Sequence, residues 1–159
     1  MTRALLVVDH GSRVALANES VAAVAELVAQ LGDYALVIGA HMELAAPSIP
    51  EAIDDAVQRG ATDLTVVPFM LAPGRHATQD IPRIVAECAA DHAGLVWRIA
   101  APLGVHALLA QLVLERAHEA TAQAAHDTAS SVATHAPAPP ATDPGTAALR
   151  TAGRDADPT

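Results

Sequence analysis

The sequence predicts an α/β fold: a four-stranded parallel sheet with flanking helices, followed by a disordered C-terminal tail. Four short, mainly apolar runs alternate with segments whose apolar residues recur at helical spacing, which is typical of successive βα units. The apolar fraction of 52% over 159 residues is enough for one hydrophobic core. We therefore expect a single domain built from four such units.

The first βα unit begins with residues 5–8, a continuous Leu-Leu-Val-Val run that is typical of a strand covered on both faces. Residues 17–31 place valines and leucines on one helical stripe. Gly32 is suited to end that helix, because glycine tolerates the conformation that helix ends require. A second strand is expected over residues 34–40.

Ser48 and Glu51 have the spacing of a capping box, which predicts the start of the second helix, and Gly60 marks its end. The third expected strand is the valine-rich segment 63–71. A third helix over residues 80–91 has Pro82 in its first turn.

The fourth unit comprises an expected strand over residues 95–100 and a helix over residues 106–118. Right-handed crossovers between these parallel strands would put helices on both faces of the sheet. The loops that follow the strands would then meet at one edge.

Residues 119–159 differ from residues 1–118 in composition. They are rich in alanine, proline and threonine, and their large apolar residues are Val132 and Leu149 alone. Such a segment cannot bury enough surface to offset the entropy cost of ordering it. We expect a folded domain over 1–118 and a disordered tail over 119–159, with the last helix extending a turn or two into it.

Composition argues against several classes of protein. Nine basic residues, all arginine, stand against 18 acidic residues, so the chain lacks the basic stripe that nucleic acids require. The single cysteine, Cys88, excludes a disulfide framework within one chain. No apolar run reaches the roughly 18 residues of a membrane span, and the amino terminus does not resemble a signal peptide. We expect a cytoplasmic protein without nucleic-acid or membrane partners.

Two histidines directly follow expected strands. His10 comes after residues 5–8, and His76 follows the third strand through a Pro-Gly turn. Both imidazoles would face one cleft at the carboxyl edge of the sheet, where they could bind a divalent metal. Each loop also carries an arginine, Arg13 or Arg75, which suits a polyanionic organic ligand better than a metal alone.

These residues also have ordinary structural interpretations. A single histidine after a strand is often a loop residue, and only the pairing of two favours metal binding. His41 and Glu43 share a face by strand alternation, but His41 is equally explained as a packed strand-end residue, so Glu43 ranks above it. Ser12 follows a His-Gly pair and raises the possibility of hydrolysis, although the sequence contains neither a G-x-S-x-G elbow nor a P-loop.

Four sequence blocks, taken together, resemble the small class II tetrapyrrole chelatases of the CbiX/SirB type. The resemblance covers residues 4–117 in order and without gaps. The blocks are VDHGSR at 8–13, HMELAAPSIP at 41–50, PFMLAPGRH at 68–76 with DIP at 80–82, and APLG at 101–104.

The resemblance implies ATP-independent insertion of Co²⁺ or Fe²⁺ into sirohydrochlorin, on the route to sirohaem or cobalamin. The metal would be a substrate, and no cofactor is expected. His10 and His76 would be the metal ligands, and His10 and Glu43 would serve in catalysis. Ala46 stands where relatives often have an acidic residue that contacts the substrate. The expected substrate-binding residues are Arg13, Ala46, Leu71, Ala72, Pro73, Gly74, Arg75 and His76.

The residue types suit this chemistry. Neutral imidazole can hold a divalent ion and release it more readily than a thiolate cage can, although it does not select between cobalt and iron. Pyrrole N–H protons must leave as the metal enters, and either Glu43 or a metal-free histidine could accept them. Arg13 and Arg75 could receive the carboxylates of sirohydrochlorin. A carrier that binds metal or tetrapyrrole without catalysis is the alternative.

We expect the chain to assemble as a homodimer. Larger relatives hold two copies of the βα domain that face each other across the macrocycle, whereas this sequence contains no internal repeat. A two-fold homodimer would supply the second wall of the site.

Overall fold

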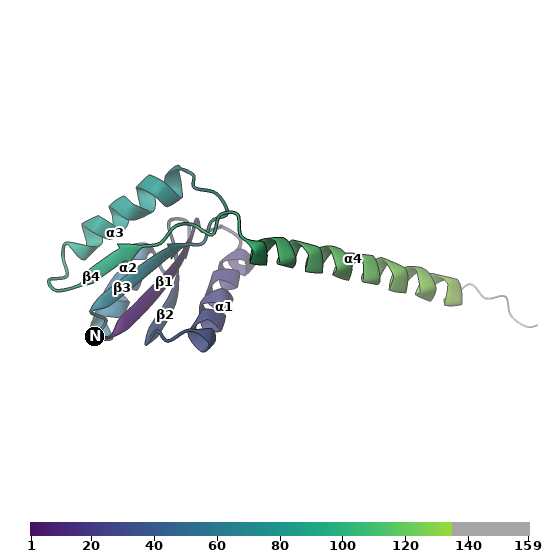
Figure 1. Ribbon diagram of the computed structural model, residues 1–159, viewed down its shortest axis with the longest axis horizontal. Helices are drawn as coiled ribbons and strands as arrows, with labels where there is room; N and C mark the ends of the chain where they lie inside the picture. Colours follow the sequence, from purple (N-terminus) through teal and green to yellow (C-terminus); the bar gives the residue numbers. More distant parts are fainter. Residues whose placement is uncertain (135–159) are drawn as a thin grey trace, which may run out of the picture. The chain divides into compact units, whose positions relative to one another are not determined.

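The computed structural model describes the backbone of residues 1–134 and the side chains of residues 1–126. Four parallel strands form one sheet in the order β2-β1-β3-β4 (Figure 1). The strands are β1 (Arg3–Asp9), β2 (Leu36–His41), β3 (Asp63–Pro68) and β4 (Val96–Ile99). The helices are α1 (Ala15–Leu31), α2 (Ile49–Gln58), a π-helical turn η1 (His76–Asp80), α3 (Ile81–Ala89) and α4 (Ala107–Thr134). The predicted fold class is confirmed.

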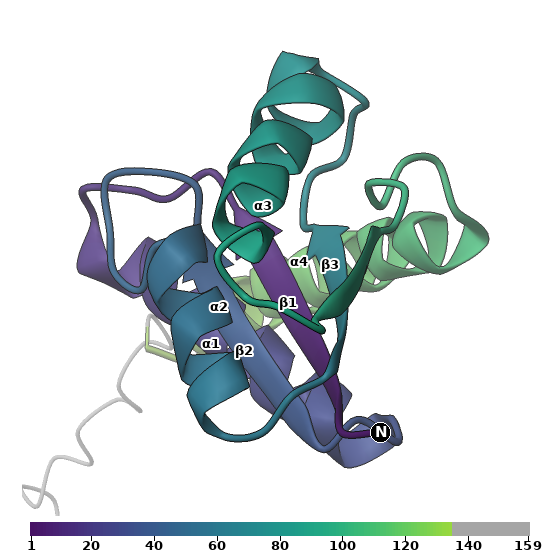
Figure 2. The ribbon, with the colours of Figure 1, turned by 90° about the vertical axis from the view of Figure 1, so that its left-hand side faces the viewer.

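The helices cover the two faces of the sheet unequally. Helices α2 and α3 lie on one face, and α1 lies on the other (Figure 2). The larger core lies on the α2 and α3 side, where Leu6, Val8 and Val66 of the strands pack with Ile53 and Ile81 of the helices. Burial of such side chains stabilises a fold by about 1.5–3 kcal/mol each. The central strand β1 is buried on both faces, as its apolar run predicts.

Register brings the ends of three strands together at the carboxyl edge of the sheet. Asp9 of β1 lies opposite His41 of β2, and Val8 lies opposite Pro68 of β3. Each strand therefore delivers its following loop to the same place, which is where parallel sheets bind ligands.

The capping box at the start of α2 forms as predicted. The Ser48 backbone N–H donates to Glu51 Oε2 at 2.7 Å, and the Glu51 N–H donates to Ser48 Oγ at 3.4 Å. Hydrogen bonds from the Ser48 backbone and side chain lower the pKa of Glu51.

The segment before α3 differs from the prediction in two ways. Strand β3 ends at Pro68 rather than at residue 71, because proline has no N–H to donate to a neighbouring strand. Helical structure begins at His76 rather than at residue 80, through a π-helical turn in which the Ile81 N–H donates to the His76 carbonyl. Such a wider turn accommodates Pro82, which cannot make the usual helical hydrogen bond. His76 therefore stands at the start of a helix.

Helix α4 is longer than predicted. It continues through Thr134, so the expected boundary between residues 118 and 119 falls inside a helix. Residues 119–134 are rich in alanine and contain no proline or glycine, and helix formation does not itself require large apolar side chains. Residues 135–159 of the expected tail lie outside the described residues. Within the described residues, no helix is long and apolar enough to cross a membrane.

The chain divides into two units at the boundary between Gln111 and Leu112. The first unit contains the whole sheet and the loops at its carboxyl edge.

Candidate metal centre at the carboxyl edge

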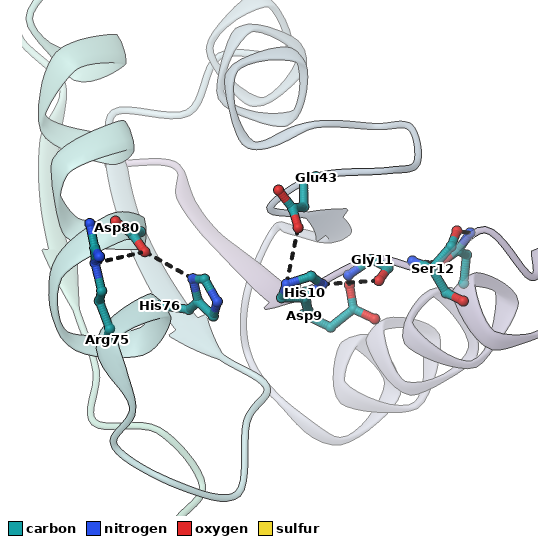
Figure 3. Close-up of polar contacts among 9 residues, drawn as sticks. Asp9, His10, Gly11, Ser12, Glu43, Arg75, His76 and Asp80 are labelled. Atoms are coloured by element: carbon teal, nitrogen blue, oxygen red, sulfur yellow. Dashed lines mark hydrogen bonds and ion pairs between the residues drawn. The ribbon is translucent and has the colours of Figure 1, made fainter.

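Three loops place the candidate residues at the carboxyl edge of the sheet (Figure 3). His10 directly follows β1, Glu43 lies in the loop after β2, and His76 begins η1 after the β3 loop. The His10 and His76 ring centroids are 5.0 Å apart, with 73° between the ring planes. Both side chains are about half exposed, at 44% and 50%, so an ion in solution can reach them. The structure thus brings together the two histidines that the sequence singled out.

Hydrogen bonds orient both imidazole rings. His76 Nδ1 lies 2.8 Å from Asp80 Oδ2, and His10 Nδ1 lies 3.3 Å from the Gly11 carbonyl oxygen. In a neutral ring whose Nδ1–H donates to an oxygen, Nε2 carries the lone pair that binds a metal. We therefore assign Nε2 of both histidines as the nitrogens able to hold an ion.

Glu43 lies beside His10. Its Oε1 is 3.1 Å from His10 Nε2, the nitrogen assigned to the metal. With an ion at His10 Nε2, the Glu43 carboxylate is close enough to bind that ion as well or to take up a proton. Within the described residues, no group of three or more His, Cys, Asp or Glu side chains is already arranged as a metal cage. Two histidines with an adjacent carboxylate leave coordination positions for a second ligand.

Gly11 allows the His10 and Glu43 loops to touch. Its φ of +88° is in the left-handed region, and a Cβ at this position would lie 1.8 Å from the Glu43 carbonyl oxygen. The Glu43 N–H also donates to the His10 carbonyl at 3.1 Å. Leu44, the next residue, has a φ of +67°, an uncommon conformation for a leucine. The site is thus built from two loops in backbone contact.

The predicted substrate-binding residues lie in the same three loops and are exposed. Arg13 precedes α1, and Ala46 lies between Glu43 and α2. Arg75 Nε is 3.9 Å from Asp80 Oδ2, and 78% of its side chain is exposed, so most of its guanidinium faces solvent. The remaining members of this set, Leu71, Ala72, Pro73 and Gly74, precede η1.

Ser12 has a structural role in the His10 loop. Its hydroxyl accepts a hydrogen bond from the Val14 N–H at 3.0 Å. Its backbone N–H and carbonyl both bond the Asn18 side chain, at 2.9 and 2.8 Å, which anchors the loop to α1. These contacts explain Ser12 without a nucleophilic role.

Three residues near the site were not identified as functional from the sequence: Asp80, Asp9 and His41. Asp80 is four residues after His76, so it shares a helical face with it, but the expected helix began too late to reveal this. Asp9 Oδ1 lies 2.6 Å from His41 Nδ1, a pairing that depends on the β1–β2 register. His41 is buried, which agrees with its interpretation as a packed strand-end residue.

Comparison with known proteins identifies the family of the chain. The CbiX family model matches residues 4–120. The chain belongs to the CbiX family. The predicted resemblance is therefore confirmed over the sheet and its loops.

Two curated proteins and one solved structure are also similar to this chain. The chain is 42% identical over 112 residues to the chloroplastic sirohydrochlorin ferrochelatase of Arabidopsis thaliana, covering 70% of this chain and 50% of that protein. It is 38% identical over 89 residues to the sirohydrochlorin cobaltochelatase of Methanocaldococcus jannaschii, covering 56% and 62%. The sirohydrochlorin chelatase SirB from Bacillus subtilis subspecies spizizenii, solved in complex with cobalt, superimposes with a TM-score of 0.71 at 30% identity, covering 75% and 51%. In each comparison the match spans about half to three-fifths of the relative.

Proposed function

We propose that this CbiX-family chain inserts a divalent metal ion, Co²⁺ or Fe²⁺, into sirohydrochlorin without ATP. The observation that carries the proposal is the approach of His10 and His76 to a 5.0 Å ring separation beside Glu43, at the edge where parallel sheets bind ligands. The names of relatives support both metals, since one is a ferrochelatase and another a cobaltochelatase.

In this proposal His10 Nε2 and His76 Nε2 hold the incoming ion, and its remaining positions face the macrocycle. As the ion bonds to the ring nitrogens, two pyrrole N–H protons leave. Glu43 Oε1, already 3.1 Å from His10 Nε2, is placed to accept one, and a histidine released by the metal can accept another. The exposed Arg13 and Arg75 receive carboxylates of the substrate by charge-assisted hydrogen bonds. Ala46 and residues 71–74 border the ring.

We further propose that the product enters sirohaem or cobalamin biosynthesis in the cytoplasm, and that the reaction needs no cofactor besides its metal substrate. The donor set of two imidazoles and one carboxylate suits either ion.

Anaerobic mixing of the protein with sirohydrochlorin and Co²⁺ or Fe²⁺, followed by absorbance, tests the proposed reaction. We expect many turnovers per chain, well above the rate without protein and independent of added ATP. A carrier would bind the metal or the tetrapyrrole stoichiometrically without raising the insertion rate. That result would contradict the enzyme and favour the carrier.

We also propose that the active unit is a two-fold homodimer with the loops at the carboxyl edge facing each other. The chain matches about half of the ferrochelatase and of SirB, so a second copy would supply an equivalent of the unmatched half. The same loops and the start of α1 expose apolar side chains that a partner would cover: Val14, Leu16, Leu44 and Leu71.

Sedimentation and activity over a dilution series test this assembly. We expect insertion activity per chain to fall in parallel with the dimer fraction, because each monomer offers one wall of the site. Wild-type chains titrated with His10→Ala chains should lose activity in proportion to heterodimer formation if both subunits act on one macrocycle. A monomer with full activity per chain would rule out the proposal.

A further inference from the structure

A part-buried Asp–His pair lies at the ends of β1 and β2, next to the loops of the candidate metal centre. Asp9 ends β1, His41 ends β2, and the two residues are register partners. Asp9 Oδ1 and His41 Nδ1 are 2.6 Å apart, and their side chains are 21% and 5% exposed. The chemistry proposed above uses neither residue, although each is next to a loop that carries a donor.

One carboxylate oxygen makes both contacts of Asp9. Oδ1 accepts the Gly11 N–H at 2.9 Å as well as bonding the His41 ring. Figure 3 shows the Asp9 carboxylate turned toward Gly11, away from His76. Asp9 therefore holds the backbone on the far side of His10 without approaching the space between the two histidines.

Backbone hydrogen bonds connect Asp9 and His10 to the loop that contains Glu43. The Met42 N–H donates to the Asp9 carbonyl at 2.9 Å, and the Glu43 N–H donates to the His10 carbonyl at 3.1 Å. The His41 N–H donates to the Pro47 carbonyl, which ties the far end of the same loop. His10 and Glu43 thus sit on two loops joined at their bases by Asp9 and His41.

We infer that Asp9 and His41 are positioning residues that set the placement of His10 Nε2 relative to Glu43, and thereby the metal affinity and the insertion rate. This inference rests on the proposed function for its rate effect, while its effect on metal affinity stands on the geometry alone. Outer residues that orient metal ligands commonly change metal affinity or activity 10–100-fold when removed.

Substitutions at both residues separate loss of the contact from loss of the charge. Asp9→Ala removes the acceptor, whereas Asp9→Asn retains an oxygen that can replace Oδ1 but weakens both hydrogen bonds by removing the charge. His41→Phe removes the donor, whereas His41→Asn can present an amide N–H near the position of Nδ1. The matched control is Asp54→Ala, which removes the carboxylate 2.8 Å from His92 Nε2, a second Asp–His pair outside the three site loops.

Co²⁺ affinity of the full-length variants, measured by competition with a chromophoric chelator, is the first readout, together with the visible spectrum of bound Co²⁺. Circular dichroism establishes that each variant is folded at the assay temperature. We expect Asp9→Ala and His41→Phe to weaken Co²⁺ binding at least about 10-fold and to change its spectrum. The Co²⁺ affinities of Asp9→Asn and His41→Asn should lie between those of the disruptive variants and that of the wild type. Asp54→Ala should bind Co²⁺ with the wild-type affinity.

Insertion kinetics are the second readout. Asp9→Ala and His41→Phe should lower kcat while leaving KM for sirohydrochlorin nearly unchanged, since neither residue is assigned to the macrocycle.

If Asp9 and His41 only stabilise the fold, these variants would have a lower Tm, but the folded protein would keep its Co²⁺ affinity, spectrum and kcat. That result would overturn the inference. If Asp9→Ala or His41→Phe fails to fold, Asp9→Asn provides the test. Wild-type Co²⁺ affinity and a wild-type spectrum in Asp9→Asn would also overturn the inference. A wild type that binds Co²⁺ without inserting it would refute the proposed function but leave the affinity effect to be observed.

Discussion

Alanine at either His10 or His76 is expected to abolish metal insertion while leaving the protein folded. Each substitution removes one of the two imidazoles that meet at 5.0 Å, and one histidine cannot hold the ion in the orientation that the macrocycle requires. Loss of a direct ligand should exceed the 10–100-fold effect typical of outer residues, so we expect a fall of more than about 100-fold. Absorbance of the metallated macrocycle measures the rate.

Stability should change little in these two variants, because both side chains are about half exposed and lie outside the buried cores. His92→Ala is the matched control, since this histidine is bonded to Asp54 outside the three site loops. Its insertion rate should equal that of the wild type. Near-normal rates in both the His10 and His76 variants would show that these residues do not hold the metal.

Gly11→Ala is expected to lower both stability and activity. A left-handed conformation costs a residue with a Cβ about 1–2 kcal/mol. At Gly11 the new Cβ would also lie 1.8 Å from the Glu43 carbonyl oxygen, a backbone atom that cannot move without shifting its loop. The His10 and Glu43 loops must therefore separate, which lengthens the 3.1 Å contact between their side chains. Thermal unfolding, Co²⁺ affinity and insertion rate measure the result.

Gly60→Ala measures the free-energy cost of the left-handed conformation alone, without the steric clash expected at Gly11. Gly60 has nearly the same φ, +90°, but no atom lies within 4 Å of the position a Cβ would take. This variant should lose stability by about 1–2 kcal/mol and keep its Co²⁺ affinity and insertion rate. Equal Co²⁺ affinities in the two alanine variants would show that the approach of Gly11 to Glu43 does not shape the site.

Local patterns were sufficient for most of the fold. The apolar run at residues 5–8 marked a strand buried on both faces, and Ser48 with Glu51 marked a helix start, because these signals depend on residues close in sequence. The errors arose where a local rule was incomplete. Pro68 ended β3 early, and the alanine-rich segment after residue 118 remained helical through Thr134, since absence of a core does not by itself break a helix.

By itself, the sequence determined the alternation of strands and helices and the positions of His10 and His76 after two of the strands. Parallel strands necessarily bring the loops after their carboxyl ends to one edge, so the meeting of these histidines could be expected. Only the tertiary structure decided which side chains would contact the imidazoles of His41 and His76. The register places Asp9 against His41, and a helix that starts at residue 76 places Asp80 against His76. Such contacts depend on separations of a few ångströms between segments distant in sequence, or on where a helix begins, and residue spacing alone does not specify either.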